Sequence, residues 1–178
     1  MFFEKNEFKD VLIVKKNPFK DERGSFSRSY CEDEFKKNGF SHKMVQTNLS
    51  ISKEKYTLRG MHMQVGDFQE DKLIQCIKGR ILDVIIDLRE NSETFGKHFS
   101  IELSEKNDLM LLVPKGFAHG FLTLEEDTIV IYQVSNYYDA SSERGFRWND
   151  PFFNINWPCT NPILSQKDSS WDDFKGLI

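Results

Sequence analysis

Short β-type segments separated by turns dominate the middle of this chain and constrain its fold more than any other feature. The apolar or alternating segments cover residues 73–77, 80–88, 99–103, 109–113, 117–124 and 128–134. Turn signals separate them, such as Lys78-Gly79 and the sequence Pro-Lys-Gly at 114–116. Short strands at a spacing of roughly ten residues are typical of an all-β sandwich, jelly roll or barrel.

Helical signals are sparse. The best candidate covers 32–37, and Asn38-Gly39 follows it in the manner of a C-cap. The segment after Tyr138 is rich in Asn, Pro, Ser and Trp, which predicts ordered loop with a late turn of helix. Because no low-complexity linker or charge block marks a boundary, we expect one domain over residues 1–178.

Composition narrows the possible function. The chain has 24 Lys and Arg against 28 Asp and Glu, a formal net charge of −4, which argues against a nucleic-acid partner. No apolar run approaches the roughly 18 residues that span a bilayer, and the first residues lack signal-peptide features, so no membrane partner is expected. The three cysteines, Cys31, Cys76 and Cys159, are far apart and odd in number, which predicts reduced thiols and a cytoplasmic location.

Two histidines lie in segments that could carry chemistry. His62 follows Leu-Arg-Gly-Met on a predicted strand, and His119 stands directly before Gly120, in a segment where glycines let a ligand or another backbone approach closely. In a β-barrel, His62, Gln64, Glu70 and His119 could converge on a divalent metal ion. Gln is a weak ligand for iron or zinc, however, so we prefer an interpretation without a metal over a metal-dependent oxygenase.

An acid–base interpretation uses other partners. His62 could act as a general base if a carboxylate such as that of Asp168 fixed its tautomer. Tyr132 could donate a proton or simply pack on its strand. Lys72 could face a developing oxyanion or extend from the rim of the fold.

Phosphate binding is indicated only by isolated basic residues. Arg23 and Arg59 each stand next to a glycine and could contact phosphates, although a surface salt bridge is the simpler role for Arg23. The chain has no Walker loop and no Gly-x-Gly-x-x-Gly motif, so nucleotide triphosphate hydrolysis and Rossmann-type hydride transfer are unsupported.

Taken together, these motifs resemble the dTDP-4-dehydrorhamnose 3,5-epimerase family. The resemblance implies an all-β cupin jelly roll (a double-stranded β-helix barrel) with short peripheral helices. The matching segments are 21–24, 45–50, 58–62, 69–73, 84–89, 94–96, 103–104, 114–121, 136–138, 148–151, 155–158 and 164–168. They follow the family's order over nearly the whole chain.

The resemblance implies a role for each matching residue. His62 matches the catalytic base, Asp168 its partner, Lys72 the lysine near the keto oxygen and Tyr132 the proton donor on the opposite face. The positions that hold the nucleotide diphosphate and the sugar are matched by Arg23, Gln46, Asn48, Arg59, His119 and Tyr138, with Arg28 near the base.

The implied reaction is epimerisation at C3, C5 or both of a nucleotide-linked 4-keto sugar, through an enolate, in the synthesis of surface polysaccharides. Family members need no metal or organic cofactor. They are typically homodimers in which a strand of one subunit completes the pocket of the other.

Three departures from the family pattern stand out. Met61 and Met63 replace the usual Leu and Tyr around His62, and the loop at 65–71 lacks the usual prolines. Arg28 stands where thymidine-binding members usually carry Glu. Because a forked Arg pairs well with guanine, we hypothesise that the nucleotide is GDP, linked to a 4-keto heptose or deoxyhexose. The alternative is that Arg28 points away from the base.

The sequence leaves three alternatives open. The enzyme could invert a single centre, or it could be a 3,4-ketoisomerase on the same fold. The joint presence of Lys72 and Tyr132 argues against a ketoisomerase. A non-catalytic sugar-binding cupin would not need His62 and Asp168.

Overall fold

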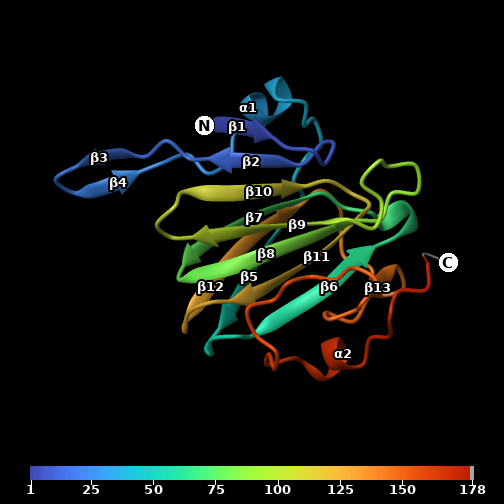
Figure 1. Cartoon of the computed structure of the whole chain (residues 1–178). Coiled ribbons are helices and arrows are strands. Elements are labelled where there is room, and N and C mark those ends of the chain that lie inside the picture. The colour runs from blue at the N-terminus through green and yellow to red at the C-terminus, as the bar shows by residue number, and fades with distance from the viewer. Residues whose placement is uncertain (177–178) are drawn as a thin grey trace.

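Two antiparallel β-sheets packed face to face form the body of the protein, as the computed structural model of residues 1–176 shows (Figure 1). The larger sheet contains, in spatial order, β1 (Phe2–Lys5), β2 (Leu12–Lys15), β10 (Leu109–Val113), β7 (Lys72–Lys78), β12 (Thr128–Val134) and β5 (Gln46–Ser52). The smaller sheet contains β13 (Glu143–Gly145), β6 (Leu58–Gln64), β11 (Phe117–Thr123), β8 (Arg80–Asp87) and β9 (His98–Ser104).

The predicted all-β class is confirmed, and the six predicted central segments coincide with β7 to β12 within one residue at each end. The predicted jelly roll is confirmed, but its sheets do not close into a barrel: among residues 1–176, the edge strands β5 and β13 do not pair, and neither do β1 and β9. A cavity lined by strands of both sheets, among them β5 and β6, lies between the sheets, and the architecture is an open-sided jelly roll. The expected single domain includes residues 177–178, which lie outside the described residues.

The core between the sheets consists of side chains that alternate inward along each strand. Ile74 and Cys76 of β7 meet Ile81 and Ile85 of β8, and Phe121 of β11 completes this layer. All five are at most 4% exposed. Burial of an apolar side chain of this size stabilises the fold by roughly 1.5–3 kcal/mol, so this layer fixes the distance between the two sheets.

Two further apolar clusters cover the outer faces. The C-terminal segment packs Phe146, Phe153 and Trp157 against the smaller sheet. On the larger sheet, α1 (Glu32–Lys37) inserts the fully buried Phe35. This helix has acidic residues in its first turn and basic residues in its last turn, which suits the helix dipole, and its bounds are those predicted from the sequence. In the described residues 1–176, no helix has the length and apolar character to cross a membrane.

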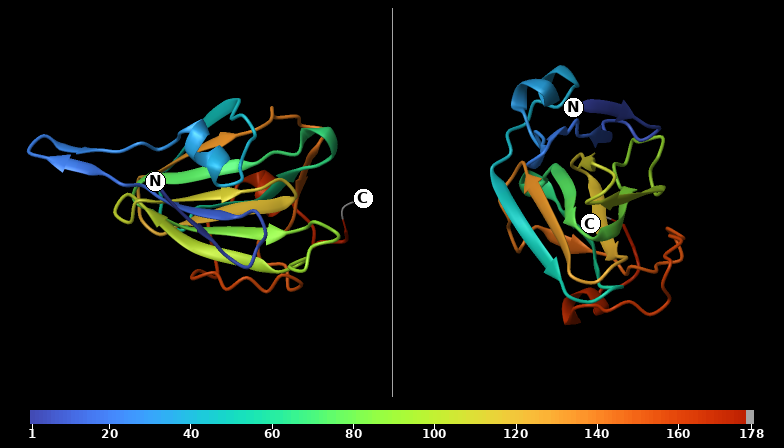
Figure 2. Two further views of the ribbon diagram at one scale, coloured as in Figure 1. Left: turned by 90° about the horizontal axis from the view of Figure 1, so that it is seen from above. Right: turned by 90° about the vertical axis from the view of Figure 1, so that its left-hand side faces the viewer.

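A two-stranded arm projects from the body. It consists of β3 (Phe19–Asp21) and β4 (Gly24–Phe26), and it extends well beyond the sheets in Figure 1 and in the left view of Figure 2. Phe19 and Phe26 at its base are 71% and 79% exposed. Exposed apolar side chains that lie together are typical of a surface that another molecule covers.

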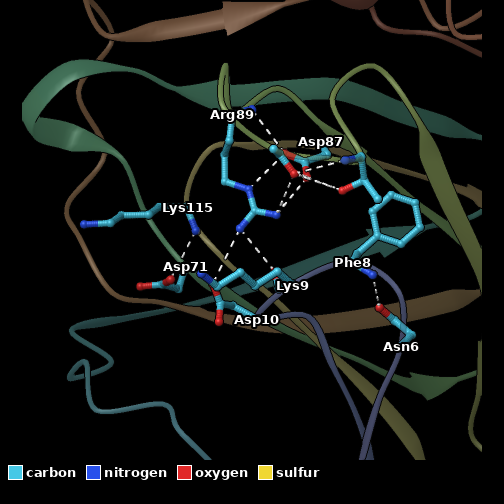
Figure 3. Close-up of polar contacts among 10 residues, drawn as sticks. Asn6, Phe8, Lys9, Asp10, Asp71, Asp87, Arg89 and Lys115 are labelled. Carbon is cyan, nitrogen blue, oxygen red and sulfur yellow. Dashed lines mark hydrogen bonds and ion pairs between the residues drawn. The ribbon is translucent and has the colours of Figure 1, made fainter.

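A buried carboxylate anchors the loop that follows β8 (Figure 3). Asp87 is fully buried and accepts hydrogen bonds from Arg89 Nη2 at 2.7 Å and from the hydroxyls of Ser92 and Thr94, each at 2.6 Å. Burial alone would raise the pKa of Asp87, but these hydrogen bonds outweigh it and lower the pKa to about 2. Arg89 also donates to the carbonyl oxygen of Lys9 at 3.1 Å, which ties this loop to the N-terminal segment.

Candidate active site

Two glycines bring His62 and His119 side by side. His62 on β6 pairs with His119 on β11, and Gly60 and Gly120 stand close to them on the same two strands. Gly60 has a φ of +131°, and a Cβ atom there would lie 2.5 Å from the Cα of Gly120. Only residues without a side chain allow this approach. The glycines near His119 were predicted to admit either a ligand or another backbone, and the structure shows that Gly120 admits the backbone of β6.

The two histidines face a cavity of about 600 Å³ between the sheets. The four predicted catalytic residues line it together with two predicted binding residues: His62, Lys72, Tyr132, Asp168, Arg59 and His119. An adjoining cavity of about 340 Å³ shares His62, Lys72 and Tyr132 and adds the predicted binding residues Gln46, Asn48 and Tyr138. The predicted site is therefore brought together from strands of both sheets.

His62 and Asp168 form a hydrogen-bonded pair. His62 Nε2 lies 2.5 Å from Asp168 Oδ1, and Asp168 is held in α2 (Gln166–Ser169), whose N-cap Ser165 accepts from the Asp168 amide at 3.0 Å. Burial would raise the pKa of Asp168, but the hydrogen bond from His62 prevails and lowers it. An ionised Asp168 favours the proton on Nε2, so the Nδ1 lone pair of the neutral ring can accept a proton.

His119 has a carboxylate partner of its own. Its Nε2 lies 2.7 Å from Oδ1 of the fully buried Asp83 on β8. The other oxygen of Asp83 is buried without a hydrogen-bond partner among residues 1–176. This bond fixes the orientation of the His119 ring at the cavity wall.

Lys72 and Tyr132 come from the larger sheet, on the wall opposite the two histidines. Lys72 is the first residue of β7, and its ammonium lies 3.0 Å from the carboxylate of Glu70. Tyr132 lies on the neighbouring strand β12. Burial raises the pKa of Tyr132, the nearby charge of Glu70 adds to this effect, and the charge of Arg59 opposes it.

Three further residues, which line the cavities or contact His62, had no predicted role. Glu143 on β13 accepts a hydrogen bond from the Tyr138 hydroxyl at 2.8 Å and forms an ion pair with Lys167 at 2.5 Å. Lys167 lines the larger cavity, and the indole of Trp171 meets the His62 ring edge-on with centroids 6.4 Å apart. Lys167 could have been suggested by its place beside Asp168, whereas no signal in the sequence pointed to Glu143 or Trp171.

Two predicted binding residues lie away from both cavities. Arg23 is at the tip of the arm, is 85% exposed and pairs with Asp21 at 2.6 Å. Arg28 follows β4, is exposed and pairs with Glu34 of α1 at 2.8 Å. Within one chain neither side chain reaches the cavity, so their predicted roles stay predictions.

The four residues that were considered as metal ligands are all bonded to other side chains. His62 pairs with Asp168 and His119 with Asp83, while Glu70 bonds both Lys72 and Gln64. Within residues 1–176, no group of three or more His, Cys, Asp or Glu side chains is arranged to hold a metal ion.

Comparison with known proteins gives consistent matches over nearly the whole chain. The model of the family described as dTDP-4-dehydrorhamnose 3,5-epimerase matches residues 5–176. The Escherichia coli K12 protein named dTDP-4-dehydrorhamnose 3,5-epimerase is 43% identical over 176 residues, covering 98% of this chain and 95% of that protein.

Two solved structures show the same fold. The Bacillus anthracis dTDP-4-dehydrorhamnose 3,5-epimerase with TDP and PPi bound superposes with a TM-score of 0.95 at 43% identity, covering 97% of this chain and 99% of that one. The Legionella pneumophila dTDP-6-deoxy-D-glucose-3,5-epimerase in complex with dTDP-4-keto-L-rhamnose has a TM-score of 0.92 at 32% identity, covering 97% and 92%.

Proposed function

The chain belongs to the dTDP-4-dehydrorhamnose 3,5-epimerase family, and we propose from this premise that it inverts C3 and C5 of a nucleotide-linked 4-keto sugar. The reaction is an isomerisation in nucleotide-sugar biosynthesis. The sugars made in this way enter surface polysaccharides. The names and ligands of the solved relatives support a dTDP-linked substrate.

One observation carries the proposal. A histidine bonded to a buried aspartate stands on one wall of the cavity, and a half-buried tyrosine stands on the opposite wall. His62 belongs to the smaller sheet, whereas Tyr132 belongs to the larger one. An epimerase that removes a proton from one face of a carbon and returns one to the other face needs acid and base on opposite sides of the ring.

His62 is the base in this mechanism. The 4-keto group acidifies the protons on C3 and C5, and the neutral His62 ring accepts one of them. Asp168 remains ionised, holds the ring in the required tautomer and stabilises the imidazolium that forms. A positioned base of this kind contributes roughly 10²–10⁴-fold to the rate.

Lys72 and Tyr132 complete the proton transfer. Removal of the proton leaves an enolate with negative charge at O4 of the sugar, and the Lys72 ammonium stabilises this charge where it develops. Tyr132 then donates a proton from the opposite face, which inverts the carbon. Because the pKa of Tyr132 is raised, its hydroxyl keeps the proton that it must donate.

The remaining polar residues are placed to bind the substrate. Arg59 and His119 line the same cavity as His62, while Gln46, Asn48 and Tyr138 line the adjoining one. We assign the first group to the sugar and diphosphate and the second to the rest of the nucleotide. No residue is assigned to a cofactor, because proton removal next to a ketone needs only a base, an acid and a cation.

A homodimer is the expected assembly. The larger sheet leaves Leu49 and Ile51 of β5 and Ile77 of β7 exposed beyond the part that α1 covers, and the arm presents Phe19 and Phe26. A second copy placed on this apolar face would cover it, and its arm would bring Arg23 to the neighbouring cavity. This arrangement gives Arg23 the binding role that one chain alone cannot.

A cytoplasmic location suits this activity, since nucleotide sugars are made there and Cys31, Cys76 and Cys159 are all free thiols. Cys76 is buried, which raises the pKa of its thiol to about 11 and keeps it unreactive.

Proton NMR in D₂O with a dTDP-linked 4-keto-6-deoxy sugar tests the function. We expect deuterium at both C3 and C5 and the appearance of the inverted sugar. A His62→Asn variant should bind the nucleotide and show no exchange, which separates catalysis from sugar binding alone. Deuterium at C3 only would identify a single-centre epimerase, and no exchange by the folded protein would contradict the proposal.

A further inference from the structure

Glu70 lies two residues before Lys72 and lines the cavity that Lys72, Tyr132 and His62 share, yet the mechanism above gives it no task. Its carboxylate Oε1 lies 3.0 Å from the Lys72 ammonium. The side chains of Lys72 and Glu70 are only 12% and 11% exposed. A pair so far withdrawn from water is not screened like a surface ion pair, so each partner strongly fixes the place of the other.

The second oxygen of Glu70 is held from the opposite sheet. Gln64 on β6 donates from Nε2 to Glu70 Oε2 at 3.2 Å. Gln64 itself is 4% exposed and cannot turn freely, because its Nε2 also donates to the carbonyl oxygens of Phe68 and Tyr137, each at 3.0 Å, and its Oε1 accepts from the Asp139 amide at 2.7 Å. The two hydrogens of Nε2 are thus shared among three acceptors, and the contact with Glu70 is the longest of the three. Glu70 therefore links β6, which carries the base, to β7, which carries the cation.

The charge of Glu70 reaches the proton donor as well. Burial contributes most to the raised pKa of Tyr132, and the negative charge of Glu70 is the second contribution. The positive charge of Arg59 opposes both. One carboxylate thus acts on two of the groups that must cooperate in the reaction.

We propose that Glu70 is a positioning residue for the epimerisation, which holds the Lys72 ammonium at the cavity wall beside Tyr132, where the enolate oxygen forms. The inference rests on the proposed function. Without the Glu70 carboxylate, the flexible Lys72 side chain loses its fixed position, and the preorganised charge that stabilises the enolate is lost with it.

The Glu70→Gln variant tests this role, because it keeps the size of the side chain and removes its charge. We expect kcat to fall roughly tenfold with KM changed less than about twofold, as for an interaction that matters in the transition state. The alkaline limb of the kcat profile should move to lower pH, since Tyr132 loses the charge that raises its pKa. The control is Glu126→Gln, which removes the same charge at an exposed position. It should leave kcat and the alkaline limb of its pH profile unchanged.

A double-mutant cycle shows whether Glu70 acts through Lys72. In a Lys72→Met background, Glu70→Gln should cost far less than tenfold in kcat, because the group that it positions is gone. Equal losses in both backgrounds would overturn the proposal. So would an increase in KM at constant kcat, which would make Glu70 a substrate-binding residue.

A titration without turnover separates this proposal from the proposed function. The tyrosinate absorbance of the protein minus that of Tyr132→Phe reports the ionisation of Tyr132 alone, and Glu70→Gln should shift it to lower pH. If the unaltered protein shows no deuterium exchange, the proposed function fails, while this titration still tests the link between Glu70 and Tyr132. An unmoved titration together with an unchanged kcat would overturn the inference about Glu70.

Discussion

His62 Nε2 and Asp168 Oδ1 lie 2.5 Å apart, although the two residues are 106 positions apart in the chain. His62 is on a central strand of the smaller sheet, and Asp168 is in a single turn of helix near the C-terminus. In the proposed mechanism the C-terminal segment therefore supplies the partner of the base, in addition to covering the sheet.

Replacing Asp168 with Asn should leave the fold intact and lower kcat by roughly 10²-fold or more. An amide can still bond His62, but it cannot stabilise the imidazolium. The measurement is the rate of deuterium incorporation at C3 and C5. Asp172→Asn, an exposed change four residues along, serves as the control. A kcat for Asp168→Asn equal to that of the control would remove Asp168 from the mechanism.

Tyr132→Phe should separate proton removal from inversion. His62 can still remove a proton and return a deuteron to the same face, so exchange without inversion should persist. Net epimerisation should fall roughly 10²-fold, because the acid on the other face is missing. NMR follows both rates in one sample, with the exposed Tyr137→Phe as control. Inversion at an unchanged rate would show that another group donates the proton.

Asp87 should contribute to stability in a defined pH range. Its pKa in the folded protein is about 2, below the ordinary 3.8. The ionised form is therefore favoured by folding, and its contribution of about 2 kcal/mol is complete above the unfolded pKa and is lost as pH falls toward the folded one.

Thermal unfolding of the parent and of Asp87→Asn between pH 2 and 6 measures this contribution. The difference in the free energy of unfolding should be largest at pH 5 to 6 and should shrink as pH falls from about 4 to about 2. A difference that stays constant over the whole range would mean that the charge of Asp87 does not contribute.

Arg28 makes the choice of nucleotide testable. The proposed function expects dTDP to bind more tightly than GDP. If the Arg28 guanidinium instead reads a guanine, GDP should bind more tightly, and Arg28→Glu should reverse that preference. Its ion pair with Glu34 leaves part of the guanidinium free to do so. Competition binding by calorimetry decides the matter, and equal binding or tighter binding of dTDP would refute the GDP hypothesis.

Mixing two inactive variants tests the exchange of arms between subunits. Arg23→Ala should lose most activity because the arm can no longer contact the diphosphate, and His62→Asn should lose the base. In a heterodimer, the cavity of the Arg23→Ala chain keeps His62 and receives an intact arm. Random mixing should then restore about a quarter of the full activity. No recovery on mixing would mean that each arm serves its own chain or none.

Local patterns in the sequence were sufficient for the central strands and for the longer of the two α-helices among residues 1–176. The alternation of apolar residues and the turns between them placed β7 to β12, and Asn38-Gly39 ended α1 where the pattern predicted. The strands β1, β3 and β13 were missed, because each has only three or four residues and is too short to show an alternating pattern. The alternating residues at 24–30 would suit a longer strand, but β4 ends at Phe26, since an arm without a facing sheet has no hydrophobic face to bury.

The identities of His62, Lys72, Tyr132 and Asp168 came from motifs and family resemblance, and those are properties of the sequence alone. Their convergence was decided by the tertiary structure. The packing of one sheet on the other sets His62 and Tyr132 on facing walls of one cavity, and the C-terminal chain brings Asp168 to His62. The tertiary structure also decided the contacts of Glu70 with Lys72 and of Asp83 with His119. Such pairings depend on the register and spacing of strands distant in sequence, and no local pattern encodes that geometry.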